Sequence, residues 1–200
     1  MIQTFQYLCL GVTFDIKQMD AETALHLQES ALKRMAEGME AMQQGDYLTA
    51  LCSMLGEDTD SYSEDAFLAQ VKLNGTTPDY DTLFAGRYEE LSNLYARILE
   101  VNYGFLLGVD ERMFLGPTKE DGSPTEPEEA TPTAVQRAQA KFSQPQMIYS
   151  VIMSDKRLAT LHELQTIYNL EDLYKLYECV AFERHTTDIY RKKAEQQRNQ

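Results

Sequence analysis

The sequence predicts a mainly α-helical protein in two parts joined by a disordered linker. Two long stretches in the first half place apolar residues at three- and four-residue steps, the repeat of an amphipathic helix. Near the C-terminus, two successive helix starts predict a small helical hairpin. We therefore expect an acidic helical domain over residues 1–115, a proline- and glutamate-rich linker over 116–142, and a C-terminal helical segment over 143–200.

Composition and charge exclude some classes of function for this protein. The chain has 200 residues, of which 43% are apolar, enough to build a core, and its net charge is −14. From Asp155 onward, eight basic residues balance eight acidic ones, so the whole acidic excess lies in the first 154 residues. The only basic cluster is the short tail at 191–198. Because nucleic-acid binding needs clustered basic residues, we expect no nucleic-acid partner.

The three cysteines Cys9, Cys52 and Cys179 are widely spaced and form no C-x-x-C pair. This spacing favours neither a disulfide framework nor a zinc site, so we expect a reducing cytosol and no metal or cofactor. No charged and apolar leader is recognisable, and no apolar stretch has the length that spans a bilayer. We expect a soluble intracellular protein without a membrane partner.

The first element, residues 2–14, is rich in aromatic and β-branched residues. Alternation of Phe5, Tyr7 and Cys9 with polar neighbours predicts a short strand or hairpin, with no evident partner beyond the hairpin itself. The spacing of Phe5, Leu8, Cys9 and Val12 also fits one face of a helix, and period alone does not decide between the two.

A long helix is predicted from Asp20, a good N-cap, to about Gln44, where Gly45 suits a left-handed helix end. One stripe of this helix carries apolar residues: Leu25, Leu32, Met35, Met39 and Met42. Such a stripe usually belongs to a core. Methionine side chains are flexible and also suit adaptable binding surfaces, so a role in partner binding is the second interpretation.

A short helix is predicted over residues 47–55, followed by an acidic loop over 57–65. Ser63 is a plausible N-cap for a further helix over residues 64–73. The acids Asp58, Asp60 and Glu64 do not follow the pattern of a calcium-binding loop, because the glycine that makes its sharp turn is missing. We therefore interpret this stretch as a solvated loop.

A turn at Asn74-Gly75 and a helix start near Pro78 lead to a second long helix after Gly86. Its apolar stripe consists of Tyr88, Leu91, Tyr95, Ile98, Asn102 and Phe105. The two long helices suit packing side by side and antiparallel. Asn102 needs a hydrogen-bond partner if it is buried, and a position facing a loop is the simplest explanation for it.

Residues 116–133 contain four prolines and two glycines among acids, which predicts a disordered linker and the main domain boundary. Pro145 then opens a small apolar helix. Thr160 and Glu163 form a capping box, and Asn169 is an N-cap for a last, longer helix. That helix has apolar residues at helical spacing: Leu173, Leu176, Tyr177 and Val180.

No motif of an enzyme is recognisable. His26, His162 and His185 fall on separate predicted helices, and no phosphate-binding glycine loop or nucleophile motif is present. We therefore expect no catalytic residues and a protein that acts by binding.

The run from Leu158 to Tyr174 carries a family resemblance. Its residues follow the pattern L-x-E-L-x-T-x-Y-x-L-x-D-L from Leu161 to Leu173. In this it resembles small proteins of tailed bacteriophages that are encoded near the tail tape-measure gene and are associated with tail assembly chaperones. The proposed arrangement of a helical N-terminal part, a linker and a smaller C-terminal part is similar to the long form of those chaperones, often made by ribosomal frameshifting.

This resemblance implies a chaperone of the host-cell cytoplasm that binds the tape-measure protein and tail-tube subunits and is absent from the finished particle. Two surfaces are expected to hold the partners. The first is the methionine stripe and the second is the face of the C-terminal hairpin: Met35, Met39, Met42, Leu161, Leu164, Tyr168, Leu173 and Tyr177.

Two other function classes fit the same sequence. One is a structural helical protein of the virion, associated with its neck or head. The other is an acidic inhibitor of a host protein, whose charge would mimic phosphate and whose binding would fall with added salt. The sequence does not set the oligomeric state.

Overall fold

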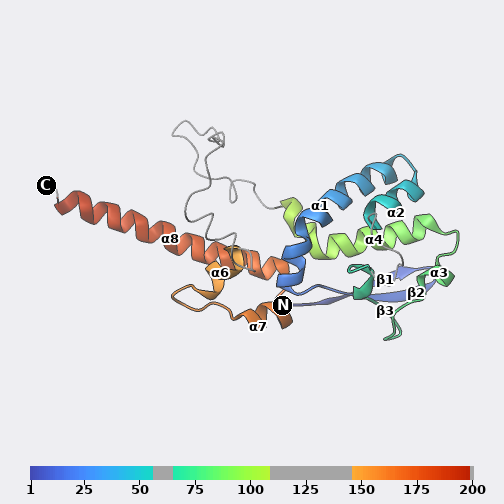
Figure 1. Ribbon diagram of the computed structural model, residues 1–200, viewed down its shortest axis with the longest axis horizontal. Coiled ribbons are helices and arrows are strands. Elements are labelled where there is room, and N and C mark those ends of the chain that lie inside the picture. Colours follow the sequence, from blue (N-terminus) through green and yellow to red (C-terminus); the bar gives the residue numbers. More distant parts are fainter. Residues whose placement is uncertain (56–64, 109–145, 199–200) are drawn as a thin grey trace.

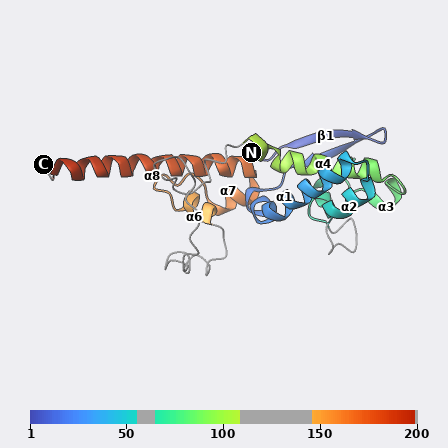
Figure 2. The ribbon, with the colours of Figure 1, turned by 90° about the horizontal axis from the view of Figure 1, so that it is seen from above.

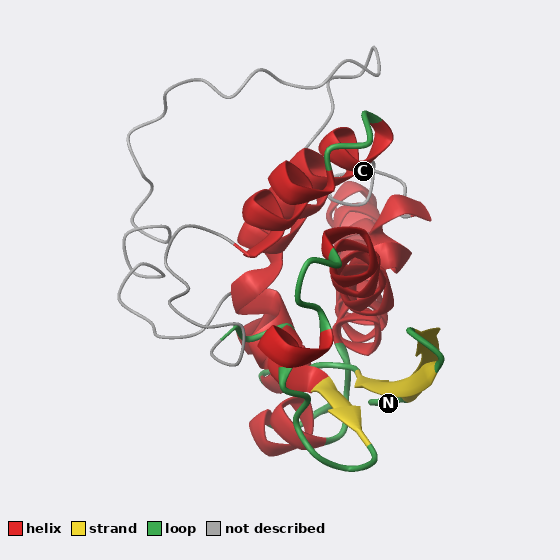
Figure 3. Cartoon of the chain, turned by 90° about the vertical axis from the view of Figure 1, so that its right-hand side faces the viewer, coloured by secondary structure: helices red, strands yellow, loops and turns green. Residues whose placement is uncertain are grey.

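The structure is a computed structural model that describes residues 1–55, 65–108 and 146–198. Within these residues the chain is mostly helical, with one small sheet that lies to one side of the helices (Figures 1 and 3). The mainly α fold class is therefore confirmed. The predicted linker over 116–142 and the acidic stretch over 57–64 lie outside the described residues.

The N-terminal stretch forms a β-hairpin. Strand β1 (Thr4–Cys9) pairs antiparallel with β2 (Val12–Lys17), and Cys9 lies opposite Val12. The two loop residues, Leu10 and Gly11, have φ angles of 54° and 76°. Positive φ at both positions is typical of the type I′ turn, whose twist matches that of paired strands. The strand interpretation is confirmed over the helical one.

A third strand, β3 (Val71–Leu73), pairs antiparallel with β2, so that Val71 lies opposite Ile16. The helix predicted over residues 64–73 is therefore wrong. The carboxylate of Asp65 accepts hydrogen bonds from the N–H groups of Phe67 and Leu68, at 2.8 and 3.0 Å, and forms a tight turn. Only the 3-10 turn Leu68–Gln70 follows it before the chain enters the sheet.

Two long helices form the body. Helix α1 (Ala21–Gln43) begins as predicted at Asp20, whose side chain accepts the N–H of Thr23, and ends before Gly45 at φ 77°. Helix α2 (Tyr47–Leu55) packs back on α1. After the short α3 (Tyr80–Leu83), helix α4 (Tyr88–Tyr103) runs back along α1 and continues as a 3-10 turn, Gly104–Gly108 (Figure 1).

Asn102 ties α4 to the connection between the sheet and α1. Its side chain is buried, accepts the N–H of Met19 at 2.8 Å and donates to the carbonyl of Ile98 at 2.9 Å. The neighbouring Tyr103 donates its hydroxyl to the carbonyl of Ala24 at 3.0 Å. Asn102 is therefore buried with the hydrogen-bond partners that burial requires, and one of them, Met19, lies in the connection before α1. These bonds fix the register between α4 and α1.

Helices α1 and α2 pack closely at a glycine in the middle of α1. A Cβ atom added to Gly38 would lie 2.5 Å from Cγ of Met54, a side chain that is fully buried. Replacing glycine by alanine in a helix ordinarily stabilises it by about 1 kcal/mol. Here we expect Gly38→Ala to lower the free energy of unfolding by about 1–3 kcal/mol, because a packed core resists added volume.

Denaturant melts of a double-mutant cycle check this expectation. Adding Met54→Ala to Gly38→Ala should recover part of the loss, since the clashing side chain is gone. Ser30→Ala, at an exposed position of the same helix, is the matched control and should leave stability unchanged or slightly higher. A Gly38→Ala variant as stable as the parent would contradict the close packing.

A buried polar cluster around Asp65, where the second described stretch begins, joins this stretch to both long helices. Asp65 accepts the hydroxyl of Tyr95 at 2.9 Å and lies 3.5 Å from the guanidinium of Arg34. That guanidinium also lies over the ring of Phe67, 6.0 Å from its centroid, and donates to the carbonyl of Met54. Both carboxylate oxygens of Asp65 are thus engaged, which holds residues 65–68 against α1 and α4.

The C-terminal segment contains three helices: α6 (Gln146–Ile152), α7 (Leu161–Thr166) and α8 (Leu170–Arg198). The capping box of Thr160 and Glu163 is confirmed, and so is Asn169 as an N-cap, since its side chain accepts the N–H of Asp172. Helix α7 ends at Thr166, and residues 167 and 168 connect it to the N-cap of α8. The carbonyls of Ile167 and Tyr168 accept N–H groups from Ile2 and Ala21.

These contacts hold the C-terminal segment on the N-terminal one. Asn169 donates its side-chain amide to Gln18 at 2.8 Å, and Gln18 donates in turn to the carbonyl of Val101 at 3.0 Å. Helix α7 packs on α1, while the first part of α8 packs on α6, α1 and α4. The buried apolar side chains of both segments belong to one core cluster.

Candidate partner-binding groove

The methionine stripe of α1 lines an open groove on the surface of the body. The groove has a volume of about 560 Å³ and lies between the second half of α1 and the middle of α4, with one residue of β1 at its edge. Its lining residues come from these three elements: Tyr7, Met35, Met39, Met42, Gln43, Asn93, Ala96, Arg97 and Glu100. The three predicted methionines are therefore brought together.

The three methionines lie at different depths. Met35 is buried with 8% of its surface exposed, Met42 is half-buried, and Met39 is 43% exposed. Their spacing of four and three residues keeps them on one side of α1, as the sequence predicts. Met35 thus belongs both to the core and to the floor of the groove. Met39 exposes an apolar side chain to solvent, and covering that side chain with a partner would be favourable.

The opposite wall of the groove is polar at its rim. Arg97 and Glu100 form an ion pair at 2.5 Å, and Asn93 and the small Ala96 lie on the same side of α4. Burial raises the pKa of the Tyr7 phenol, an effect that the charge of Cys9 strengthens and the positive charge of Arg97 opposes. An apolar floor with a polar, charged rim is the usual composition of a protein–protein contact.

The predicted residues of the C-terminal hairpin do not reach this groove. Leu164 and Leu173 are fully buried in the chain's own core, and Leu161, Tyr168 and Tyr177 are half-buried against it. Burial of Leu164 and Leu173 follows from the packing of α7 and α8 on α1 and α6. Charged substitutions at these two positions would unfold the hairpin before they tested any partner contact.

The sequence indicated one wall of the groove and missed the other. Asn93, Ala96 and Glu100 share one side of α4 at three- and four-residue steps, but they are too polar or too small to read as an apolar stripe. Tyr7 was assigned to a strand, and its contact with α4 depends on where the hairpin docks. In the sequence, the only local indication of this second wall is a stripe of polar residues on α4 that is interrupted by the small Ala96.

Among the described residues no cluster of histidine, cysteine, aspartate and glutamate has the geometry of a metal site. His26, His162 and His185 are exposed and lie on α1, α7 and α8. Cys9 is buried, while Cys52 and Cys179 are exposed, and all three are free thiols. Within the part of the chain that the structure describes, no helix is both long and apolar enough to cross a bilayer.

Comparison with known families identifies a match in the N-terminal half of the chain. A family model described as "Phage tail assembly chaperone protein, TAC" matches residues 10–111, which run from the hairpin loop past the end of α4. No curated protein and no solved structure matches the chain. The matched range contains every groove residue except Tyr7.

The match confirms the resemblance to tail assembly chaperones but not its location in the chain. The residues that suggest the resemblance, Leu158 to Tyr174, lie in the last quarter, whereas the family model covers the N-terminal half and supports no similarity in that quarter. Helical caps and apolar residues at ordinary spacing produced the earlier pattern, and these are features of many helical hairpins. Because the match covers slightly more than half of its residues, the chain belongs to the phage tail assembly chaperone family.

Proposed function

We propose that this chain acts as a tail assembly chaperone by binding the tape-measure protein and tail-tube subunits while a phage tail is built. Family membership supports a role in tail assembly and indicates that the role is not enzymatic. It also favours action in the cytoplasm of the infected host and not in the finished virion. The groove lined by the methionine stripe carries the proposal further, because it lies within the matched half.

The groove is proposed to receive the apolar face of a helix of the tape-measure protein. Met39 and Met42 would cover that face, and their flexible thioethers would adapt to successive apolar side chains of a long partner. Arg97 and Glu100 at the rim would stay hydrated and orient the partner. The net charge of −14, which lies in the N-terminal 154 residues, would keep the complex soluble.

The contact with tail-tube subunits is proposed for the C-terminal segment over 143–200. Within the predicted hairpin face, Leu161, Tyr168 and Tyr177 keep part of their surface in solvent and are the residues available to a partner. Leu164 and Leu173 would serve by holding α7 and α8 in place.

Substitution of Met39 tests the groove. We expect Met39→Glu to weaken binding of purified tape-measure protein about tenfold or more, measured by calorimetric titration, since a charge replaces a central apolar contact. The fold should persist because Met39 is 43% exposed. Leu48→Glu is the matched control: Leu48 is 53% exposed on α2, outside the groove, and its substitution should leave the affinity unchanged. Equal affinities of parent and Met39→Glu would refute the groove as the binding site.

The composition of purified particles separates this function from a structural role. Mass spectrometry of mature virions should find the tape-measure and tube proteins without this chain. Recovery of the chain in virions at a fixed copy number would instead favour a structural component of the neck or head.

A further inference from the structure

Helix α8 extends well beyond the body of the protein (Figures 1 and 2). Its first turns pack on α6, α1 and α4, and Val180 is its last buried residue among those whose side chains are described. From residue 181 to 198, every described side chain is exposed or half-exposed. Because most of the stability of helices in proteins comes from tertiary packing, a partner that covered this part of α8 would stabilise it.

An apolar stripe runs along this exposed part of α8. Cys179, Phe182, Thr186 and Ile189 follow one another at steps of three, four and three residues, the repeat of a coiled-coil seam. Phe182 is 69% exposed and Ile189 is 40% exposed. The hydroxyl of Thr186 donates to the carbonyl oxygens of Phe182 and Glu183, at 2.9 and 3.0 Å, and this satisfies the only polar group of that side chain.

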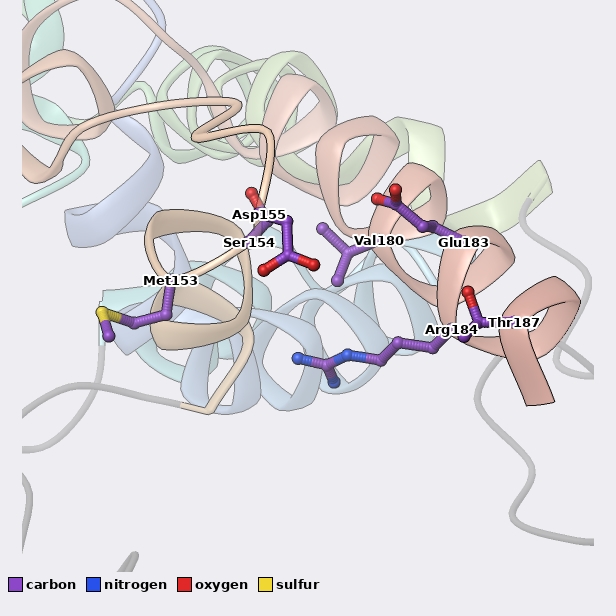
Figure 4. A pocket seen from close by; sticks show the side chains of 7 residues that line it. All are labelled: Met153, Ser154, Asp155, Val180, Glu183, Arg184 and Thr187. Atoms are coloured by element: carbon purple, nitrogen blue, oxygen red, sulfur yellow. The ribbon is translucent and has the colours of Figure 1, made fainter. Parts of the chain in front are cut away.

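Hollows lie on both sides of Glu183. A groove of about 590 Å³ follows the stripe and is walled by Lys156, which forms an ion pair with Glu183 at 3.3 Å. A second hollow of about 340 Å³ lies between Met153 and Asp155, in the connection from α6 to α7, and Val180 and Arg184 of α8 (Figure 4). Cys179, Phe182 and Thr186 of the stripe therefore line an open groove.

Charge along α8 is divided between its two ends. Residues 170–183 contain four acids and one lysine, whereas residues 184–198 contain five basic residues and two acids. Two such helices side by side in the same direction would place like charges together. In opposite directions, each basic end would lie along the acidic end of the other, which is the complementarity that sets orientation in helix pairs.

We propose that α8 pairs antiparallel with α8 of a second copy of this chain and buries the stripe in the contact. When the two stripes are aligned over their full length, Cys179 of one copy lies opposite Ile189 of the other. Phe182 of one copy then lies opposite Thr186 of the other. The contact stands apart from the groove on α1 and α4, and it needs no other protein.

The first test measures the mass of the purified full-length protein by sedimentation equilibrium. We expect a dimer of the 22.9 kDa chain that dissociates on dilution. Phe182→Glu should convert it to a monomer without unfolding the body, because 69% of the Phe182 side chain is exposed in the monomer. Leu8→Glu is the matched control, since Leu8 is 71% exposed on the hairpin, and it should leave the dimer intact.

The second test fixes the orientation. In a Cys52→Ser background, Ile189→Cys should give a disulfide-linked dimer with an added oxidant, through Cys179 of one copy and the introduced thiol of the other. The same background without Ile189→Cys should cross-link weakly, because the two Cys179 thiols lie on opposite sides of the pair's centre. Strong cross-linking through Cys179 alone would overturn the antiparallel arrangement.

Three outcomes of the sedimentation experiment would overturn the proposal: a monomer at every concentration, a dimer that Phe182→Glu leaves intact, or a dimer that Leu8→Glu abolishes equally. The last two would place the contact elsewhere. These measurements use the purified chain alone, so a result against the dimer would not affect the proposal that the groove binds the tape-measure protein. Loss of tape-measure binding in Met39→Glu would likewise say nothing about the dimer.

Discussion

Replacing Asp65 by alanine should lower the free energy of unfolding by about 3 kcal/mol or more. The substitution removes the acceptor for two backbone N–H groups and for the Tyr95 hydroxyl, and it leaves the Arg34 guanidinium without its carboxylate. Asp65 itself is only 4% exposed, so water cannot fully replace these bonds. Urea denaturation followed by circular dichroism measures the loss.

Two further variants separate charge from hydrogen bonding. Asp65→Asn keeps an oxygen acceptor for the turn but loses the negative charge, so we expect an intermediate loss. Asp46→Ala removes a similar bond to a backbone N–H, that of Thr49, but at an exposed site, where we expect a much smaller effect. An Asp65→Ala variant no less stable than Asp46→Ala would contradict the structural role of the cluster.

The protein should lose stability steeply as the pH rises above about 10. Burial raises the pKa of Tyr80, Tyr95 and Tyr103 well above the ordinary value of about 10, and the charge of Asp65 adds to the shift of the first two. Below pH 10 these phenols are neutral in both states. Above it they ionise only in the unfolded chain, which lowers the free energy of unfolding by about 1.4 kcal/mol per pH unit for each tyrosine.

The combined loss is about 4 kcal/mol at pH 11, a large part of the stability of an ordinary domain. Urea melts across this pH range measure it. Tyr103→Phe lacks one of the three phenols, so its loss over the same range should be about one third smaller, whatever its stability at neutral pH. A loss of equal size in the variant and the parent would show that Tyr103 does not contribute to the alkaline transition.

Elements with local signals were predicted closely from the sequence. Asp20, Gly45, Thr160 and Asn169 mark helix ends through side-chain or backbone geometry that involves residues only three or four positions away. Such signals operate wherever the rest of the chain lies. The β-hairpin was favoured for the same reason, because its turn and its pairing are both local.

Features that depend on distant contacts were missed. Strand β3 has three residues, and its strand conformation is set by pairing with β2, more than fifty positions earlier in the chain. Nothing within residues 64–73 predicts that pairing, whereas Ser63 and the apolar residues after it favour a helix. Here tertiary contacts overrode local propensity, as they do most readily in short strands.

The candidate site was predicted in part for the same physical reason. The stripe of Met35, Met39 and Met42 lies on one helix, so its spacing could be read directly. Whether a stripe is covered depends on the elements that pack against its helix, and here Met35 is buried whereas Met39 stays 43% exposed. In the hairpin face, Leu164 and Leu173 are both fully buried where α7 and α8 pack on the rest of the chain.

The bonds between the first residues and the turn before α8 also bear on the order of folding during synthesis. Ile2 and Ala21 donate to the carbonyls of Ile167 and Tyr168, and Asn169 donates to Gln18, 151 positions away. A ribosome makes Ile167, Tyr168 and Asn169 long after the hairpin and α1 have emerged. The nascent N-terminal part therefore waits with the N–H groups of Ile2 and Ala21 open to water, and the last contacts close only when the C-terminal segment leaves the exit tunnel.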